Sequence, residues 1–170
     1  METSFQVRDY DETLFPEVDD FLTKLGRIEG DETPLTTSEL AKATEARSFL
    51  GRLWSLTDPA TPKSSLGSMP VGFGIYRCES SPELVPVCLP DHREMSLFLP
   101  MILWVDKLAG RTHAGRDLTV WIPEHDFCTS FLLLRLKFEA GESIDWRQNS
   151  RRTPYVAPVG RVTSLGLAVS

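Results

Sequence analysis

Beyond residue 70 the chain consists of short apolar or alternating runs, and the connections between them constrain how these runs can pair. The runs cover 71–78, 84–89, 96–105, 117–123 and 128–141, with a weaker one at 159–170. Their length and alternation are typical of β-strands. Polar turns separate them, and we identify no helical connection of the dozen or more residues that parallel pairing requires. The pattern therefore predicts a mainly antiparallel sheet, folded as a sandwich or a small barrel.

The first 56 residues have a helical pattern instead. Residues 14–26 place apolar side chains at spacings of three and four, with Pro16 in the first turn and Gly26 at the end. Residues 37–56 begin at a Thr–Ser cap and are rich in strong helix formers. The predicted fold class is α+β, with two N-terminal helices packed on the antiparallel sheet.

Residues 57–70 separate the two patterns. This segment combines prolines, serines and a glycine, a composition that predicts a mobile linker. A chain of 170 residues has the length of one ordinary domain. We therefore expect a single domain over 1–170, with a helical part at 1–56 and a β-rich part at 71–170.

The terminal and cysteine patterns indicate where the protein works. The first twelve residues carry acids and no apolar run, which argues against a signal peptide. No segment reaches the roughly 18–20 apolar residues of a membrane-spanning helix. Three cysteines without a close pair indicate reduced thiols rather than a disulfide framework. These features predict a cytoplasmic or intracellular protein without a transmembrane segment.

Two short segments carry the residue types of a metal site. "CLPDHRE" contains Cys88 and His92, and "PEHDFC" contains His125 and Cys128. Zinc accepts two thiolates and two imidazoles at such spacings. Both thiols, however, lie at the ends of apolar runs, where free cysteine commonly fills the core. We expect unrelated strand-end residues and no metal; a zinc-bound module or small enzyme that uses these four residues is the alternative.

The sequence contains no complete catalytic set. Cys88 or Cys128 is a possible nucleophile with a histidine as its base, but neighbouring Asp–His pairs on a strand point to opposite faces. A serine elbow, a phosphate loop and a dinucleotide fingerprint are all absent. The G-x-G of "VGFGIY" lies in a strand and predicts a bend or a bulge. We therefore expect no catalytic residues and no cofactor.

The charge is unevenly distributed along the chain. Residues 1–60 hold 13 acids and 6 bases, a balance of −7, while residues 61–170 hold 11 acids and 12 bases, a balance of +1. The bases gather in two segments, and an aromatic residue beside them suits a contact surface. The interaction residues that we predict are Trp146, Arg147, Arg151, Arg152, Lys107, Arg111 and Arg116.

Two kinds of partner are compatible with these residues. The acid-rich segment 9–20 of another copy, or a protein partner, would complement the arginines. An anionic nucleic acid or membrane surface is the other possibility.

No motif identifies a family, and the overall texture resembles that of viral matrix or phage assembly proteins. The sequence thus predicts a non-catalytic structural or adaptor protein that acts through self-association or a protein partner.

Overall fold

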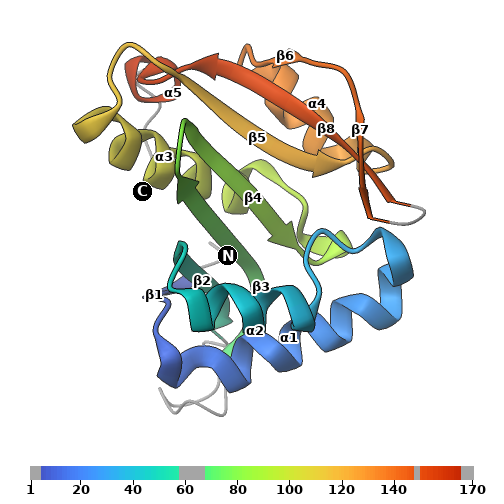
Figure 1. The fold of residues 1–170 in the computed structure, drawn as a ribbon. Coiled ribbons are helices and arrows are strands. Elements are labelled where there is room, and N and C mark those ends of the chain that lie inside the picture. The colour runs from blue at the N-terminus through green and yellow to red at the C-terminus, as the bar shows by residue number, and fades with distance from the viewer. Residues whose placement is uncertain (1–4, 58–67, 148–149, 166–170) are drawn as a thin grey trace.

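The computed structural model describes residues 5–57, 68–147 and 150–165, and these form a mixed sheet of eight strands with helices on both faces (Figure 1). The strand order is β1-β2-β3-β4-β5-β8-β6, and β7 also pairs with β8. The strands are β1 (Phe5–Asp9), β2 (Leu50–Thr57), β3 (Ser68–Cys78), β4 (Pro82–Cys88), β5 (Asp117–Pro123), β6 (Glu139–Ala140), β7 (Ile144–Arg147) and β8 (Ser150–Pro158).

The helices form two layers around this sheet. Those described are α1 (Phe15–Glu29), α2 (Thr37–Ala46), α3 (Met95–Thr112), α4 (Phe127–Arg135) and α5 (Arg161–Ser164). Short 3-10 turns precede α1 at Glu12–Leu14 (η1), follow it at Gly30–Glu32 (η2) and lie before α3 at Pro90–His92 (η4). Figure 1 shows α1 and α2 on one face of the sheet and α3 and α4 on the other.

The predicted α+β class, with two N-terminal helices on an antiparallel sandwich or barrel, is wrong. Segment 96–105 lies entirely in α3, and segment 128–141 lies largely in α4, with only the two residues of β6 in a strand. α3 is the helical crossover that the sequence did not reveal, and it allows β4 and β5 to pair in parallel. An apolar run buried against a sheet looks the same whether it is a strand or a helix.

The N-terminal part contributes strands as well as helices. The helix predicted at 14–26 is confirmed as α1, but it continues past the predicted stop at Gly26 to Glu29. The helix predicted at 37–56 ends at Ala46. Arg47 follows with a positive φ of 51°, which stops the helix, and β2 begins at Leu50. The start of α2 has the reciprocal cap between Thr36 and Glu39.

Other expectations are mixed in outcome. The strands predicted at 71–78, 84–89 and 117–123 are confirmed as parts of β3, β4 and β5. Strands β1, β2, β7 and β8 were not predicted. The described part of 159–170 contains the short helix α5.

Most of the predicted linker, 58–67, lies outside the described residues, while residues 68–70 belong to β3. No helix within the described ranges is long and apolar enough to cross a membrane.

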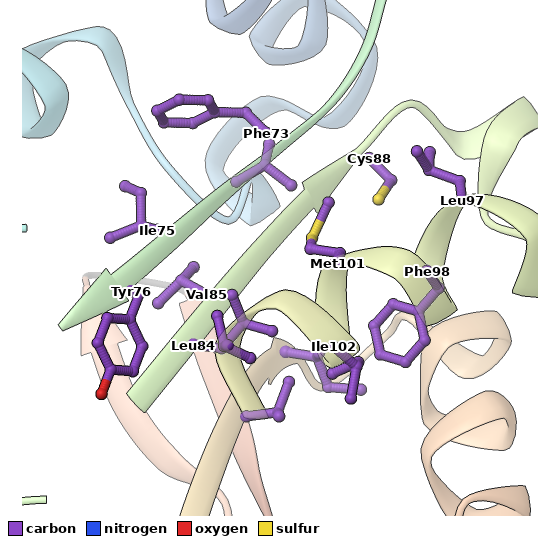
Figure 2. Close-up of a cluster of buried hydrophobic side chains, with 14 of the residues drawn as sticks. Phe73, Ile75, Tyr76, Leu84, Val85, Cys88, Leu97, Phe98, Met101 and Ile102 are labelled. Carbon is purple, nitrogen blue, oxygen red and sulfur yellow. The ribbon is translucent and has the colours of Figure 1, made fainter. Parts of the chain in front are cut away.

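Two glycines of β3 set how closely α3 lies against the sheet. A Cβ atom at Gly72 would lie 3.2 Å from a methyl group of Leu97, and one at Gly74 would lie 3.1 Å from Cγ of Met101. Figure 2 shows Met101 and Leu97 of α3 directed toward the strands that carry Phe73 and Cys88. The G-x-G sequence therefore serves close helix–sheet packing. The bulge predicted for it is also present, because the pairing of β2 with β3 shifts in register between Trp54–Gly72 and Ser55–Pro70.

This packing can be tested at Gly74. Replacing Gly74 by valine should lower the free energy of unfolding by about 1–3 kcal/mol, because the added methyl groups overlap Met101 and Trp104. A second substitution, Met101→Ala, should recover part of that loss only if the two side chains compete for the same space. Urea denaturation measures both effects.

Gly110 in α3 provides the control, since a Cβ atom there would meet nothing within 4 Å. Gly110→Ala should raise stability by up to about 1 kcal/mol through helix propensity. If Gly74→Val were as well tolerated as Gly110→Ala, the close contact would not limit the distance between α3 and β3.

Candidate functional site

The parallel strands β4 and β5 diverge toward their carboxyl ends. They pair at Glu83 with Thr119 and at Leu84 with Val120, and the residues that follow in each strand do not pair with one another. Figure 1 shows the two arrows pointing the same way and separating. In open sheets with parallel strands, ligands bind outside the carboxyl ends of those strands. A ligand site is therefore expected in the region beyond Cys88 and Pro123.

A buried cluster of charged side chains occupies this region. Arg93, in the turn between β4 and α3, donates through Nη2 to Oε1 of Glu29 at the end of α1. Its Nε lies 3.6 Å from Oδ2 of Asp126, in the turn between β5 and α4. The three side chains are only 9%, 7% and 6% exposed. The cluster therefore joins α1 to the turns that follow both parallel strands.

Asp126 has a second role as the cap of α4. Its Oδ1 accepts a hydrogen bond of 3.0 Å from the backbone N–H of Thr129, and its Oδ2 accepts one of 2.6 Å from the Thr129 hydroxyl. A carboxylate at a helix N-terminus satisfies unpaired amides and interacts favourably with the helix dipole. Asp126 is thus fixed from two sides, by Arg93 and by its own helix.

His125 extends the cluster toward solvent. Its Nε2 lies 2.8 Å from Oε2 of Glu29, and its Nδ1 lies 3.5 Å from Oε2 of Glu32. Since a carboxylate can only accept, Nε2 carries the hydrogen in the pair with Glu29. In the neutral ring, Nδ1 then has a free lone pair. A histidine that is held by a buried carboxylate through one nitrogen can take up a proton at the other, and here the Glu32 carboxylate lies beside that second nitrogen.

A cavity of about 400 Å³ lies beside His125. It is lined by Glu32, Glu124, His125, Phe127, Ser150 and Arg151. Arg151 contacts two carboxylates, Glu124 at 3.1 Å and Asp145 at 3.6 Å. Glu32 lies 3.5 Å from His125 and pairs with no arginine of the described residues. Acidic lining favours a cationic ligand, such as a protonated amine.

The two segments that suggested zinc do meet, but through other residues. "CLPDHRE" contributes Arg93 to the cluster, and "PEHDFC" contributes His125 and Asp126. Cys88 is buried, and burial raises the pKa of its thiol to about 12, which opposes metal ligation as a thiolate. Cys128 is exposed on α4, and His92 lies in η4. The described part of the chain has no group of three or more residues placed to hold a metal ion, so the zinc alternative is unsupported.

The predicted interaction residues are largely engaged within the protein. Arg147 pairs with Glu39 at 3.1 Å and donates to the carbonyl of Thr33 at 2.5 Å. The Trp146 indole N–H lies 3.3 Å from the other oxygen of Glu39. Arg152 is 1% exposed, so the expectation that it is a surface residue is wrong. Arg151 is half-exposed, and the role of this segment in partner binding stays a prediction.

The other predicted interaction residues, Lys107, Arg111 and Arg116, lie mainly on helix α3. Lys107 and Arg111 are exposed on α3, and Arg116 donates to the carbonyl of Ser80 at 2.6 Å. Whether these three bind an anionic partner is likewise a prediction that the geometry leaves open.

Sequence reasoning missed Glu29, Glu32 and Arg93. Glu29 and Arg93 are 64 residues apart, and Glu29 and His125 are 96 residues apart. Glu29 is also the last residue of the amphipathic helix α1, and a single acid at that position does not by itself indicate a functional site. The only available signal was the concentration of polar residues directly after two strands.

Comparison with known proteins was informative at the level of structure alone. No family model matches the chain, and no curated protein matches it. Among solved structures, NAA60 of Arabidopsis thaliana in complex with acetyl-CoA is similar with a TM-score of 0.65 and 10% identity, over 92% of this chain and 99% of that one.

Two bacterial structures give the same result. The ribosomal-protein-S18-alanine N-acetyltransferase of Escherichia coli has a TM-score of 0.61 and 13% identity, over 92% of this chain and 94% of its own. An acetyltransferase of the GNAT family from Streptococcus pneumoniae has a TM-score of 0.58 and 13% identity, over 92% of this chain and 100% of its own. The fold of this chain is therefore the GNAT acetyltransferase fold.

These likenesses overturn the function predicted from the sequence. The structures from Escherichia coli and Streptococcus pneumoniae, which resemble the chain over nearly its whole length, are named as acetyltransferases, and neither is a viral matrix or phage assembly protein. The prediction of a non-catalytic structural or adaptor protein of viral type is contradicted. It rested on the absence of a complete catalytic set in the sequence and on the overall texture of the chain.

The buried cluster should matter far more for stability than a surface pair of the same kind. Replacing Glu29 by alanine leaves Arg93 buried without its closest partner, and we expect a loss of about 3–5 kcal/mol in unfolding free energy. Glu124→Ala removes a partner of the half-exposed Arg151 and should cost less than about 1 kcal/mol. Thermal and urea denaturation measure both. Equal losses would show that burial gives the cluster no special weight.

Proposed function

We propose that this protein is an acyl-CoA-dependent N-acyltransferase that acts on a cationic amine. The observation that carries the proposal is the position of the His125–Glu29 pair. It lies at the carboxyl ends of β4 and β5 and lines an acidic cavity, in a chain with the GNAT fold. A proton acceptor and an amine-attracting cavity at that place suit transfer of an acyl group to nitrogen.

The start of α3 meets one of the needs of a coenzyme A pyrophosphate, which is a set of free hydrogen-bond donors. The backbone fits: the N–H groups of Met95 and Ser96 donate no hydrogen bond to any residue that the structure describes, and they begin an 18-residue helix directly after β4. Unpaired amides and the helix dipole make such a terminus favourable for phosphate. These amides are the groups that we propose would hold the cofactor's phosphates.

The side chains around this terminus fit less well. Glu94 is exposed at the cap position of α3 and makes no capping hydrogen bond, so its charge repels an anion. Arg93 is the nearest base, but it is committed to Glu29 and Asp126. We therefore propose that the cofactor is held by the backbone of α3 and bound weakly.

The protein's own residues would prepare the acceptor. An amine is protonated at neutral pH, and only its deprotonated form has a lone pair for attack. Nδ1 of His125 takes this proton, and the Glu29 carboxylate at Nε2 stabilises the imidazolium that forms. Glu32 attracts the ammonium to the cavity beforehand. Acyl-CoA, when bound, supplies a thioester carbonyl as the acyl donor.

An intracellular location is part of the same proposal. Cys78, Cys88 and Cys128 are all free thiols in the structure, which suits a reducing compartment.

The proposal is tested by incubating the protein with acetyl-CoA and a panel of polyamines and peptides with free N-termini. Mass spectrometry of the acceptors measures acetylation. Replacing His125 by glutamine should lower kcat about 10²–10⁴-fold, because the proton acceptor is lost. Lys107→Gln, an exposed change on α3, should leave the rate unchanged. Absence of acetylated product with the whole panel, together with no binding of acetyl-CoA by calorimetry, would overturn the proposal.

A second prediction concerns the cofactor alone. Replacing Glu94 by glutamine removes a negative charge from the N-terminus of α3 and should tighten acetyl-CoA binding about two- to fivefold, the effect expected for one charge at a helix end. Asp91→Asn, in the preceding turn, should have a smaller effect. Isothermal titration calorimetry gives both affinities. If Glu94→Gln bound the cofactor no better than the unaltered protein, the phosphates would not lie at this terminus.

A further inference from the structure

A cysteine and a histidine lie in direct contact away from the His125 cluster. Cys78 is the last residue of β3, and His113 directly follows the last residue of α3. The Cys78 Sγ lies 2.8 Å from Nε2 of His113, although the two residues are 35 positions apart in the chain. Both side chains are half-buried, so solvent reaches the pair. An imidazole at this distance can take the thiol proton, and the thiolate is the form that attacks electrophiles.

The position of His113 favours this proton transfer. Its backbone N–H closes the last turn of the 18-residue helix α3 by donating to the carbonyl of Ala109 at 2.7 Å. A cation at a helix C-terminus is stabilised by the helix dipole, so this position favours the imidazolium. Within the described part of the chain, the ion pairs between histidine and a carboxylate both belong to His125. No acid there competes with the Cys78 thiolate for the charged ring.

Tyr76 supplies a second hydrogen-bond donor to the sulfur. It lies two residues before Cys78, and therefore on the same face of β3. Burial, and after it the charge of Cys78 and a hydrogen bond to its side chain, raise the pKa of Tyr76 to about 12. The phenol thus keeps its proton at neutral pH and can donate it to a thiolate.

The backbone holds the two sides of the pair together. Arg116 donates from its guanidinium to the carbonyl of Ser80 at 2.6 Å, which ties the loop after α3 to the turn after Cys78. The Arg116 backbone N–H closes a turn to the carbonyl of His113 at 3.1 Å, with Gly115 at a φ of 86°. The contact between thiol and imidazole is therefore held in place by both of its loops.

The other charged groups next to the pair affect it less. Glu79, Arg111, Arg116 and Asp117 are exposed, so water and salt screen their charges. Arg77 lies on the opposite face of β3, because successive strand residues alternate.

The reaction partner of Cys78 has to come from outside the described chain. Cys88 pairs with Gly72, six residues along β3 from Cys78, which corresponds to about 20 Å. A disulfide requires Cα atoms within about 7 Å. Cys128 lies beyond the carboxyl end of β5, whereas Cys78 lies beside Pro82, the first residue of β4. Neither cysteine is placed to form an internal disulfide with Cys78.

We propose that Cys78 is a reactive thiol, with His113 as its base, that forms a mixed disulfide with a small external disulfide such as glutathione disulfide. The thiolate attacks one sulfur atom, the new S–S bond forms as the old one breaks, and the departing thiolate takes the proton held by His113. A free thiol reverses the reaction, and no other oxidant is needed. The proposal is independent of acyl transfer, because it uses no residue of the His125 cluster or its cavity.

The experiment compares the cysteines within one protein. The full chain is reduced, desalted and incubated with glutathione disulfide near pH 6, and peptide mass spectrometry follows the modification of each cysteine with time. Cys78 should react about tenfold or more faster than Cys128. Cys128 is a demanding reference, because it is more exposed and is the second residue of α4, where a helix N-terminus also favours a thiolate.

Variants then test the role of the imidazole. His113→Gln should slow Cys78 about tenfold near pH 6 and leave Cys128 unchanged. The difference between variant and unaltered protein should shrink near pH 9, where an unassisted thiol is largely ionised. Arg111→Gln, an exposed change in the last turn of α3, should leave both rates unchanged.

Two results would overturn the proposal. One is a rate at Cys78 no higher than that at Cys128 near pH 6, which needs no variant and so holds even if His113→Gln fails to fold. The other is an unchanged Cys78 rate in a folded His113→Gln protein, which would show that the contact is structural only.

Discussion

The close packing of α3 on β3 is the contact on which the arrangement of the site depends. Gly72 and Gly74 let Leu97 and Met101 reach the strand backbone, so the helix lies flat on the sheet as it crosses from β4 to β5. That crossover is what makes β4 and β5 parallel. Parallel strands that pair at two positions and then separate leave their carboxyl ends open for side chains from the turns beyond them.

The charged cluster shows how this opening is stabilised. Arg93, Glu29 and Asp126 belong to three different parts of the chain, and each is almost completely buried. Burying these charges removes them from water, and the ion pairs within the cluster offset that free-energy cost only when their geometry is good. The cluster therefore fixes the positions of its residues more than it adds net stability. The residue that benefits is His125, which is held by Glu29 yet remains about one third exposed. A rigid inner cluster and an accessible outer residue are the combination that proton transfer requires.

The sequence revealed the elements that have a local signature and missed those that depend on distant partners. α1 was predictable because one face is apolar and the other polar and Pro16 lies in its first turn, although the helix continues past the predicted stop at Gly26 and ends before Gly30. α3 was not, because it is apolar on several sides: Leu97, Phe98, Met101, Ile102 and Val105 are all buried, and the result imitates a core strand. Because this segment was interpreted as a strand, the parallel pairing of β4 with β5 and the fold class were predicted wrongly.

The site shows the same division. The two polar turns were identified from their composition, and His125 was named as a candidate ligand. The residues that give it a role, Glu29 and Glu32, lie in the N-terminal part of the chain and contact it only through the fold. Trp146 and its neighbouring arginines were identified as unusual, but the partner expected from outside is in part Glu39 of the same chain.

The two glycines of β3 also have a consequence for how the protein folds. Glycine loses more backbone freedom than other residues on entering a strand and offers no side chain to neighbouring strands, so it weakens β3 when the strand is considered alone. The missing contacts are supplied by α3, whose Leu97 and Met101 fill the space above the glycines. Strand and helix are therefore stable only together. The centre of the sheet and its crossover helix should form and open as one cooperative unit, with β3 unable to persist while α3 is detached.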